Sequence, residues 1–344
     1  MGAVRWGMRD CKTGDPRAMN QRSPSRAGLL ISGLGVIFLL IALVAGRSSA
    51  AAAVDEDLFV DEFVASVPAQ SLAAEWLPDG RLLILARDGV VSVTDLSGAS
   101  QQVLQMSNVS TAGERGALDL ALHPNFATNN QFFVYHATDE VQAKLRIVRY
   151  TLDETSASAT KNSRVQIWEN PGPDHTTNFH IGGSLEVSND NKLLLTIGDG
   201  FRAADSALLD RVFGKVIRLN LDGSIPSDNP FVGTSGALDE IYAHGLRNPF
   251  RSWVDPLTGE HWVGDVGGNN ATRAYEEINL IEPGASYGWP ACEGPLGAPK
   301  NGPICPSGTT GPWHYYAHDV NDSCCSNRSI TLGERYRGLS LIHI

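Results

Sequence analysis

The amino-acid sequence predicts an all-β protein built from repeated four-stranded units, and three observations support this prediction. A polar turn followed by an apolar strand recurs four times, at irregular intervals of about 50 to 70 residues. No long amphipathic helical pattern lies between these units, and the chain has 35 glycines but only 19% charged residues. This combination is typical of a β-propeller, whereas a body of about 290 residues is too long for a single β-sandwich. The four turns lie at Asp79-Gly80, Asn129-Asn130, Asn189–Asn191 and Thr258-Gly259.

The chain begins with a targeting segment rather than with a structural element. Residues 1–53 carry seven basic side chains against two acidic ones, and an uncharged apolar run extends from Ala27 to Gly46. A basic start, an apolar run and a small-residue site near Ala53–Val54 predict a secretory signal peptide. The run has about the minimum length of a membrane span, so a retained N-terminal anchor is the alternative. Either way we expect the body of the chain, residues 54–338, to be periplasmic or secreted.

The rest of the chain is strongly acidic. Of the 27 basic and 38 acidic residues, 20 and 36 lie beyond residue 53, which is a net charge of about −16. Such a surface argues against binding to nucleic acid. It is compatible with a neutral or cationic substrate, or with a bound metal. No pattern in the sequence indicates an oligomeric state.

The segment Asn178–Gly200 contains the pattern on which the predicted site depends. Apolar runs at Ser184–Val187 and Lys192–Ile197 flank a polar turn, which predicts a β-hairpin. Because both ends of a hairpin lie at the same edge, His180 and Asp199 should come close together. A carboxylate beside an imidazole fixes its tautomer and raises its basicity, as a general base requires. An ordinary hairpin with a capping histidine and a turn aspartate is the alternative interpretation.

Further polar loops lie next to predicted strands at matching places in the repeat. Arg247 and Asn248 lie in the loop His-Gly-Leu-Arg-Asn-Pro, and Gly267 and Gly268 follow the next apolar strand. Equivalent loops of propeller blades meet at one end of a central channel. We therefore expect these residues to converge with His180.

Four of the five cysteines lie in the last sixth of the chain. Cys292 and Cys305 flank a loop rich in glycine and proline, and we expect them to form a disulfide in an exported protein. The vicinal pair Cys324-Cys325 cannot easily form a bond within itself.

Six pieces of the sequence, in order over about residues 58–340, resemble the glucose/sorbosone dehydrogenase family, the soluble quinoprotein sugar dehydrogenases. The pieces are E-R-G-A-L-D-L-A-L-H-P-N-F at 114–126, N-F-H-I-G-G-S-L at 178–185, T-I-G-D-G at 196–200, G-K-V-I-R-L-N-L-D-G at 214–223, H-G-L-R-N-P at 244–249 and E-E-I-N-L-I…Y-G-W-P at 276–290. The resemblance implies a six-bladed propeller that binds pyrroloquinoline quinone with calcium. It also implies oxidation of a sugar hydroxyl, with the electrons passed to an external acceptor.

The resemblance also implies roles for individual residues. His180 matches the general base, and Asp199 matches its carboxylate partner. Arg247 and Asn248 match residues beside the reactive quinone carbonyl. Hydride leaves a C–H bond only as the adjacent hydroxyl loses its proton, so a base must lie within hydrogen-bond reach of that hydroxyl. A guanidinium would stabilise the negative charge that grows on the quinone oxygen.

Gly267 and Gly268 match the backbone carbonyls that hold the calcium of the cofactor, and such oxygens are ligands that calcium accepts. Asp265 is interpreted either as a calcium ligand or as a turn residue. We interpret Glu276-Glu277 as a solvated start of a strand, with calcium binding as the alternative. The segment Tyr287–Pro290 is interpreted as packing at a blade edge.

The resemblance stops before the end of the family pattern. The family continues for another blade or more, in which basic residues contact the carboxylates of the quinone, and residues 339–344 match nothing in it. We therefore expect a propeller that is incomplete at its C-terminus. A non-enzymatic extracellular ligand-binding propeller is the alternative function. The combination of a base and a cation, His180 and Arg247, favours the enzyme.

Overall fold

The computed structural model describes residues 66–140, 143–172, 177–270, 274–296, 305–318 and 329–335. All of these residues belong to one compact unit, Asp61–Arg337. The predicted targeting segment, Cys324-Cys325 and the tail 339–344 lie outside the described residues, so the predicted segment boundaries stay predictions. None of the helices in the described ranges is long and apolar enough to cross a membrane.

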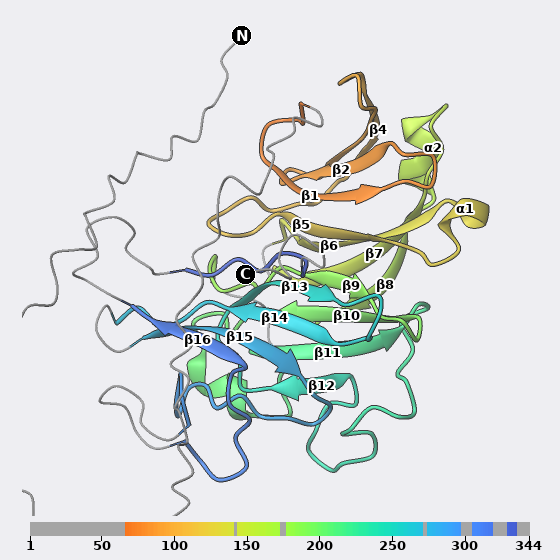
Figure 1. Cartoon of the computed structure of the whole chain (residues 1–344). Helices are drawn as coiled ribbons and strands as arrows, with labels where there is room; N and C mark the ends of the chain where they lie inside the picture. Colours follow the sequence, from red (N-terminus) through yellow and green to blue (C-terminus); the bar gives the residue numbers. More distant parts are fainter. Residues whose placement is uncertain are drawn as a thin grey trace, which may run out of the picture. The chain divides into compact units, whose positions relative to one another are not determined.

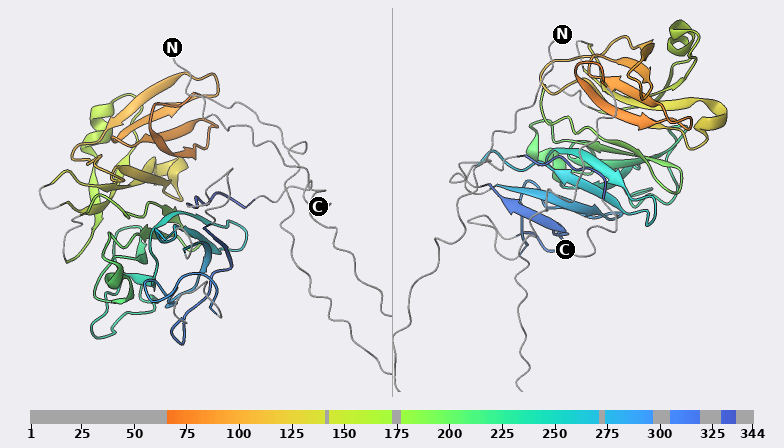
Figure 2. Two further views of the ribbon diagram at one scale, coloured as in Figure 1. Left: turned by 90° about the vertical axis from the view of Figure 1, so that its left-hand side faces the viewer. Right: turned by 45° about the horizontal axis from the view of Figure 1, so that its top comes forward.

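The described residues form four antiparallel sheets, each with four strands in consecutive order (Figure 1). We name these sheets blades 1 to 4, and their succession from orange to blue is visible in two further views (Figure 2). Blade 1 consists of β1 (Ser71–Trp76), β2 (Leu82–Ala86), β3 (Val90–Thr94) and β4 (Ser100–Gln105). Blade 2 consists of β5 (Ala117–Leu122), β6 (Gln131–Ala137), β7 (Leu145–Thr151) and β8 (Val165–Glu169). Blade 3 consists of β9 (Leu185–Val187), β10 (Lys192–Ile197), β11 (Lys215–Asn220) and β12 (Ile241–His244). Blade 4 consists of β13 (Pro249–Val254), β14 (His261–Asp265), β15 (Tyr275–Ile281) and β16 (His314–Ala317). Three short helices lie in the connections: α1 (Phe126–Asn129), α2 (Ala157–Asn162) and the 3-10 helix η3 (Ala203–Ala207).

The apolar run of β10 shows why these segments form stacked sheets. Its side chains alternate between two hydrophobic clusters, since successive residues of a strand point to opposite faces. Leu193 and Leu195 pack with Phe133 of blade 2, whereas Leu194 packs with Val263 of blade 4. A strand covered on both faces is apolar at nearly every position, which is the pattern that the sequence shows.

The innermost strands of consecutive blades lie next to one another, β1 beside β5, β5 beside β9 and β9 beside β13. Arg251 on β13 ties these strands together. Its Nη2 donates to the carbonyl oxygens of Leu72 and Leu118 at 3.0 and 3.1 Å, and its Nη1 donates to Gly183 O. One guanidinium therefore joins blade 4 to the inner edges of the three blades before it.

These sheets confirm the predicted all-β propeller, with β10 and β14 in different blades as expected. The described part of the chain contains four blades rather than the six that the family resemblance implies, and the predicted incompleteness at the C-terminus stays a prediction. The physical reason is length, because each blade with its loops takes about 50 to 70 residues of this sequence.

The predicted disulfide between Cys292 and Cys305 is present, with Cα atoms 5.1 Å apart. It lies in the connection between β15 and β16. The same connection contains the residues 287–290, which reach the candidate site.

Candidate active site

His180 and Asp199 lie at the two ends of the β9–β10 hairpin, and their buried side chains are hydrogen-bonded. The distance from His180 Nδ1 to Asp199 Oδ1 is 2.7 Å. An ionised carboxylate can only accept hydrogen bonds, so this contact assigns the imidazole proton to Nδ1 and leaves Nε2 as the basic nitrogen. Asp199 Oδ1 also accepts the N–H of Phe201 at 2.9 Å, which holds the carboxylate in place. The predicted proximity of the two side chains is confirmed.

The backbone of His180 adopts a left-handed conformation, with φ of 53°, which is uncommon for a residue other than glycine. Two contacts hold it there. Glu114 Oε2 accepts the His180 N–H at 2.7 Å, and the Phe201 ring stacks on the imidazole with centroids 4.1 Å apart. Strained backbone of this kind persists only where the surroundings fix it. Glu114 belongs to the first of the six family-like pieces, but nothing in that piece indicates a contact with His180.

Arg247 enters the site from the connection between β12 and β13. Its Nη2 lies 3.1 Å from His180 Nε2 and 3.1 Å from Asn269 Oδ1, and its Nη1 donates to Val266 O at 2.9 Å. Within the described ranges no carboxylate forms an ion pair with this guanidinium. The side chain is only 5% exposed, so its charge is buried and is available to an anionic or polar ligand.

Asn248 and Asp265 organise the backbone around Arg247. Asp265 accepts the N–H groups of Arg247 and Asn248 at 2.9 and 2.7 Å, which supports its interpretation as a turn residue. Burial raises the pKa of Asp265 to about 7, and these two backbone hydrogen bonds act in the opposite direction. The Asn248 side chain accepts the N–H of Gly182 at 3.1 Å, so its oxygen joins the Arg247 loop to the start of the hairpin.

Gly267 and Gly268 follow β14 on the same side as Arg247, which contacts the preceding carbonyl of Val266. Their N–H groups donate to Glu276 Oε2 and Glu293 Oε1, at 3.1 and 2.6 Å. A Cβ at Gly267 would clash with the carbonyl of Tyr275, so this close approach requires glycine. The described part of the chain contains no group of three or more histidine, cysteine, aspartate or glutamate side chains that could hold a metal ion.

Trp289 is a site residue that the sequence interpretation missed. Its indole Nε1 donates to Asp199 Oδ2 at 2.8 Å, and the Arg247 guanidinium lies over its ring, 5.5 Å from the centroid. Asp199 therefore binds His180 with one oxygen and Trp289 with the other. The segment Tyr287–Pro290 contributes to the site and does more than pack a blade edge. Its position 90 residues after Asp199 gave no local signal of this contact.

The interpretation of Glu276-Glu277 as a solvated strand start is wrong, because both side chains are buried. Glu276 lies between the Gly267 N–H and His318 Nε2, the latter at 2.7 Å. Glu277 accepts the Gly294 N–H, and burial followed by the nearby charge of Asp265 raises its pKa to about 8. Alternation along β15 points one of them to each face, and both faces are covered.

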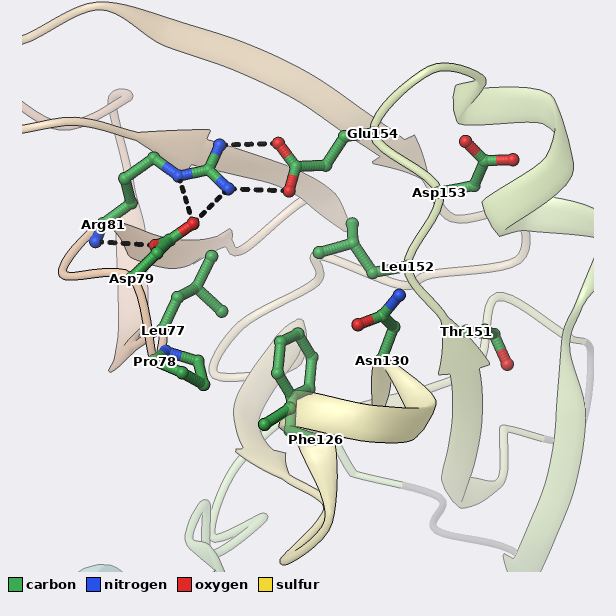
Figure 3. A pocket seen from close by; sticks show the side chains of 11 residues that line it. Leu77, Pro78, Asp79, Arg81, Phe126, Asn130, Thr151, Leu152, Asp153 and Glu154 are labelled. Atoms are coloured by element: carbon green, nitrogen blue, oxygen red, sulfur yellow. Dashed lines mark hydrogen bonds and ion pairs between the residues drawn. The ribbon is translucent and has the colours of Figure 1, made fainter.

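A cavity of about 630 Å³ lies away from these residues, between blade 1 and blade 2 (Figure 3). Its wall includes Phe126, Leu152 and an ion-paired group of Arg81, Asp79 and Glu154. The arginine in this wall is already paired with two carboxylates. We therefore assign the candidate site to the end of the blades that carries His180.

Residues 69–317 match the family model described as Glucose / Sorbosone dehydrogenase. The chain belongs to the glucose/sorbosone dehydrogenase family. The match spans all four blades and includes every site residue described above.

The chain is similar to sugar dehydrogenases of this family. It is 30% identical to the aldose sugar dehydrogenase YliI of Escherichia coli over 222 residues, which cover 63% of this chain and 58% of that protein. It is also 30% identical to quinoprotein glucose dehydrogenase B of Acinetobacter calcoaceticus over 249 residues, or 64% of this chain and 50% of that protein. The chain thus spans about half the length of the curated relatives it matches.

Among solved structures, the chain resembles the PQQ-bound form of the aldose sugar dehydrogenase of Streptomyces coelicolor. The TM-score is 0.64 with 26% sequence identity, and the likeness covers 75% of this chain and 71% of that one. This likeness supports the propeller fold independently of the strand pairing.

Proposed function

We propose that this protein is an exported quinoprotein dehydrogenase that oxidises a hydroxyl of an aldose, with pyrroloquinoline quinone and calcium as cofactors. The observation that carries the proposal is the buried contact series from Trp289 through Asp199 and His180 to Arg247. A general base with an orienting carboxylate and a buried cation beside it can carry out proton and hydride abstraction from an alcohol. Relatives of the same family are sugar dehydrogenases, one of them with the quinone bound.

The side chains present fit a flat, anionic cofactor. The Arg247 guanidinium offers charge without a carboxylate partner in the described residues, and aromatic rings lie beside it. Phe179 and Phe201, which are 47% and 53% exposed, pack edge to face next to His180. Exposed rings next to a buried cation can cover the faces of a planar ligand whose charged atoms meet the guanidinium. When bound, the quinone would supply the acceptor for the hydride.

His180 is the residue proposed to take the proton. Its Nδ1–H is held by Asp199, so Nε2 carries the free electron pair that accepts a hydroxyl proton. In this structure the same Nε2 receives an N–H of Arg247. A substrate hydroxyl that donates to His180 therefore takes the place of this contact. The imidazolium that forms is stabilised by the carboxylate of Asp199.

Arg247 is the residue proposed to stabilise negative charge on the acceptor. Once its Nη2 is released from Nε2, the guanidinium keeps its contact with Val266 O and can donate to a developing oxyanion. Asn248 is proposed to act beside it, since its backbone N–H is fixed by Asp265. Both residues are positioned before any ligand binds, so little reorganisation is required.

Gly267 and Gly268 are the residues proposed to hold calcium through their carbonyl oxygens. Two backbone carbonyls fit the hard oxygen chemistry of Ca²⁺ but supply only part of the six to eight ligands it takes. The remaining ligands would come from the cofactor and water. The nearby carboxylates of Glu276 and Glu293 already accept the N–H groups of these two glycines, which fixes the turn from its other side.

The proposed function is tested by adding calcium and the quinone to purified protein and following reduction of a dye with a panel of aldoses. We expect dye reduction that requires both additions and that is strongly reduced in His180→Ala. Aldose binding without dye reduction would instead favour the alternative, a ligand-binding propeller. Absence of both would reject a role in sugar chemistry.

The proposed export rests on the N-terminal segment alone. Sequencing the N-terminus of the protein recovered outside the cytoplasm separates the two routes. A start near Val54 means a cleaved signal peptide, whereas an intact N-terminus in the membrane fraction means an anchor. Recovery of the intact protein from the cytoplasm would contradict export.

A further inference from the structure

Lys215, the first residue of β11, is fully buried although it carries an amine. Its Nζ donates to three main-chain carbonyl oxygens, those of Asp205, Ser206 and Phe213, at 2.9, 2.9 and 2.6 Å. An ammonium group has three N–H bonds and no acceptor, so three carbonyls satisfy it completely. Lysine is almost never fully buried without partners, and here the backbone provides them.

Several groups around Nζ oppose the effect of burial on its charge. Burial lowers the pKa of Lys215 to about 7, while the carboxylates of Asp205 and Asp210 act in the opposite direction. The three carbonyl oxygens add partial negative charge directed at Nζ, and a neutral amine would have only two N–H bonds for three acceptors. His244, paired with Lys215 on β12, is kept neutral, since burial and then the Lys215 charge lower its pKa to about 4.

Two of the three carbonyls belong to η3, the helix that follows Asp199. The Asp199 carbonyl accepts the N–H of Arg202 at 2.8 Å, and the Arg202 carbonyl accepts the N–H of Asp205 at 2.7 Å. The next donor in this series is the Lys215 ammonium, which donates to Asp205 O and Ser206 O. Consecutive hydrogen bonds therefore join Lys215 to the residue that orients His180.

The same junction reaches the arginine of the site. Ser206 O accepts the N–H of Gly245, two residues before Arg247, at 3.0 Å in addition to the Lys215 ammonium. Gly214, next to Lys215, accepts the N–H of the residue directly before Arg247 at 3.2 Å. A Cβ at Gly214 would clash with the Ser206 hydroxyl, so only glycine permits this approach.

We propose that the Lys215 ammonium is an internal cation that fixes Asp199 and Arg247 relative to each other and so maintains the His180–Asp199 hydrogen bond. Lys215 is a positioning residue, since it acts through η3 and the Arg247 loop. Without the cation, the carbonyls of Asp205 and Ser206 lose their shared partner. The Asp199 segment then moves relative to Arg247, whose carbonyl accepts the Asp199 N–H at 2.7 Å. The catalytic consequence rests on the proposed function, whereas the structural statement does not.

The first test compares Lys215→Ala and Lys215→Met with the parent, all without added quinone. The readout is the NMR signal of the His180 Nδ1 proton, which reports the bond to Asp199 directly. We expect loss or a clear shift of this signal in both variants, with circular dichroism unchanged. Lys192→Ala, on the neighbouring strand of the same sheet, is the matched control and should leave the signal in place. An unchanged signal in folded Lys215→Ala overturns the proposal.

Chemical rescue separates the cation from the packing of the side chain. Lys215→Ala removes three carbons and the ammonium, which correspond to n-propylammonium, whereas the methionine side chain fills the same space. We expect millimolar n-propylammonium to restore the Nδ1 proton signal in Lys215→Ala but not in Lys215→Met. Tetramethylammonium has no N–H bond and should restore neither. Equal rescue by both salts, or rescue of both variants, contradicts a hydrogen-bonded cation site.

A measurement on the parent keeps the proposal falsifiable if both variants fail to fold. The ¹⁵N resonance of Lys215 Nζ distinguishes ammonium from amine, and we expect the ammonium form at pH 6, below the pKa of about 7, with slowly exchanging protons. Finding the amine form there overturns the proposal. In loaded protein, Lys215→Ala should lower kcat roughly 10- to 100-fold, as displaced catalytic groups do. A parent that reduces no dye would reject the proposed function but leave the NMR tests intact.

Discussion

Arg81 and Arg247 lie at opposite ends of the blades and have different hydrogen-bond partners. Arg81, just before β2, lies in the wall of the 630 Å³ cavity and binds two carboxylates, Asp79 at 2.5 Å and Glu154 at 2.6 Å (Figure 3). Arg247, just before β13, binds an imidazole, an amide oxygen and a carbonyl. In the described part of the chain no carboxylate forms a direct ion pair with Arg247, although its charge acts on the carboxyl groups of Asp265 and Glu293. The more buried of the two arginines is therefore the one without a direct carboxylate partner.

The comparison shows that the size of a cavity is a poor guide to the chemistry in its wall. The Arg81 side chain is 33% exposed, so its ion pairs are screened by water and contribute little beyond local stability. Arg247 is 5% exposed, and a cation at that depth without a direct ion pair is costly unless hydrogen bonds compensate it, as is typical of functional sites.

The largest effect is expected for His180→Ala in protein loaded with the quinone and calcium. Loss of the proton acceptor should lower kcat by roughly 10²–10⁴, the usual range for removal of a general base. The affinity for the quinone should change little, since the imidazole is proposed to act on the substrate. Steady-state dye reduction with an aldose measures kcat, and quenching of protein fluorescence on titration measures quinone binding. Equal turnover in variant and parent would reject His180 as the base.

Arg247→Ala should lower kcat by roughly 10²–10³, as loss of one donor to a developing oxyanion does, and should also weaken quinone binding. The same measurements apply. Arg81→Ala is the matched control, an arginine with two carboxylate partners at the opposite end of the blades. It should leave turnover and quinone affinity unchanged and lower the free energy of unfolding by about 0.5–1 kcal/mol. Similar losses of turnover in Arg247→Ala and Arg81→Ala would contradict a specific role of Arg247 in the reaction.

The hairpin and the proximity it creates could be predicted because their signals are local. The turn Asn189–Asn191 and the alternating apolar runs define β9 and β10, and hairpin geometry alone brings His180 to Asp199. Arg247 required one more assumption, that equivalent loops of different blades meet at one end. That assumption was correct, since Arg247 Nη2 lies 3.1 Å from His180 Nε2.

The remaining members of the site could not be predicted because nothing in the local pattern encodes their contacts. Trp289 reaches Asp199 across 90 residues, and its segment reads as ordinary packing. Lys215 follows a glycine at the start of a strand, where a charged side chain normally points to water. The three carbonyls around its Nζ come together only in the tertiary structure. Glu114 accepts the backbone N–H of His180, and a contact with a backbone N–H leaves no signal in the residue types around position 180.

Trp289→Phe should lower kcat about 10- to 30-fold by removing the indole N–H that holds Asp199 Oδ2, a hydrogen bond to a charged group. The ring beside Arg247 is retained, so quinone affinity should stay close to that of the parent. The His180 Nδ1 proton signal should shift, because the carboxylate gains freedom to rotate. Trp313→Phe is the matched control, since that side chain is 68% exposed on blade 4. A defect confined to protein stability would show that Trp289 only packs.

The smallest effect is expected for His261→Phe, at the first position of β14, in the stability of the protein towards acid. Both ring nitrogens of His261 are buried without a hydrogen-bond partner in the described residues, and burial lowers its pKa to about 3. Since the folded pKa lies below the ordinary value of 6.5, the unfolded chain binds a proton that the folded protein rejects. The contribution of His261 to the free energy of unfolding is therefore complete above pH 6.5 and is lost as the pH falls towards 3. Between pH 6.5 and 5.5 this residue should lower the free energy of unfolding by about 1 kcal/mol.

Urea denaturation at these two pH values measures the difference. His261→Phe should remove this part of the acid dependence, whereas His314→Phe, at an exposed position of β16, should not. An identical pH dependence in His261→Phe and the parent would mean that the buried imidazole is satisfied and titrates normally.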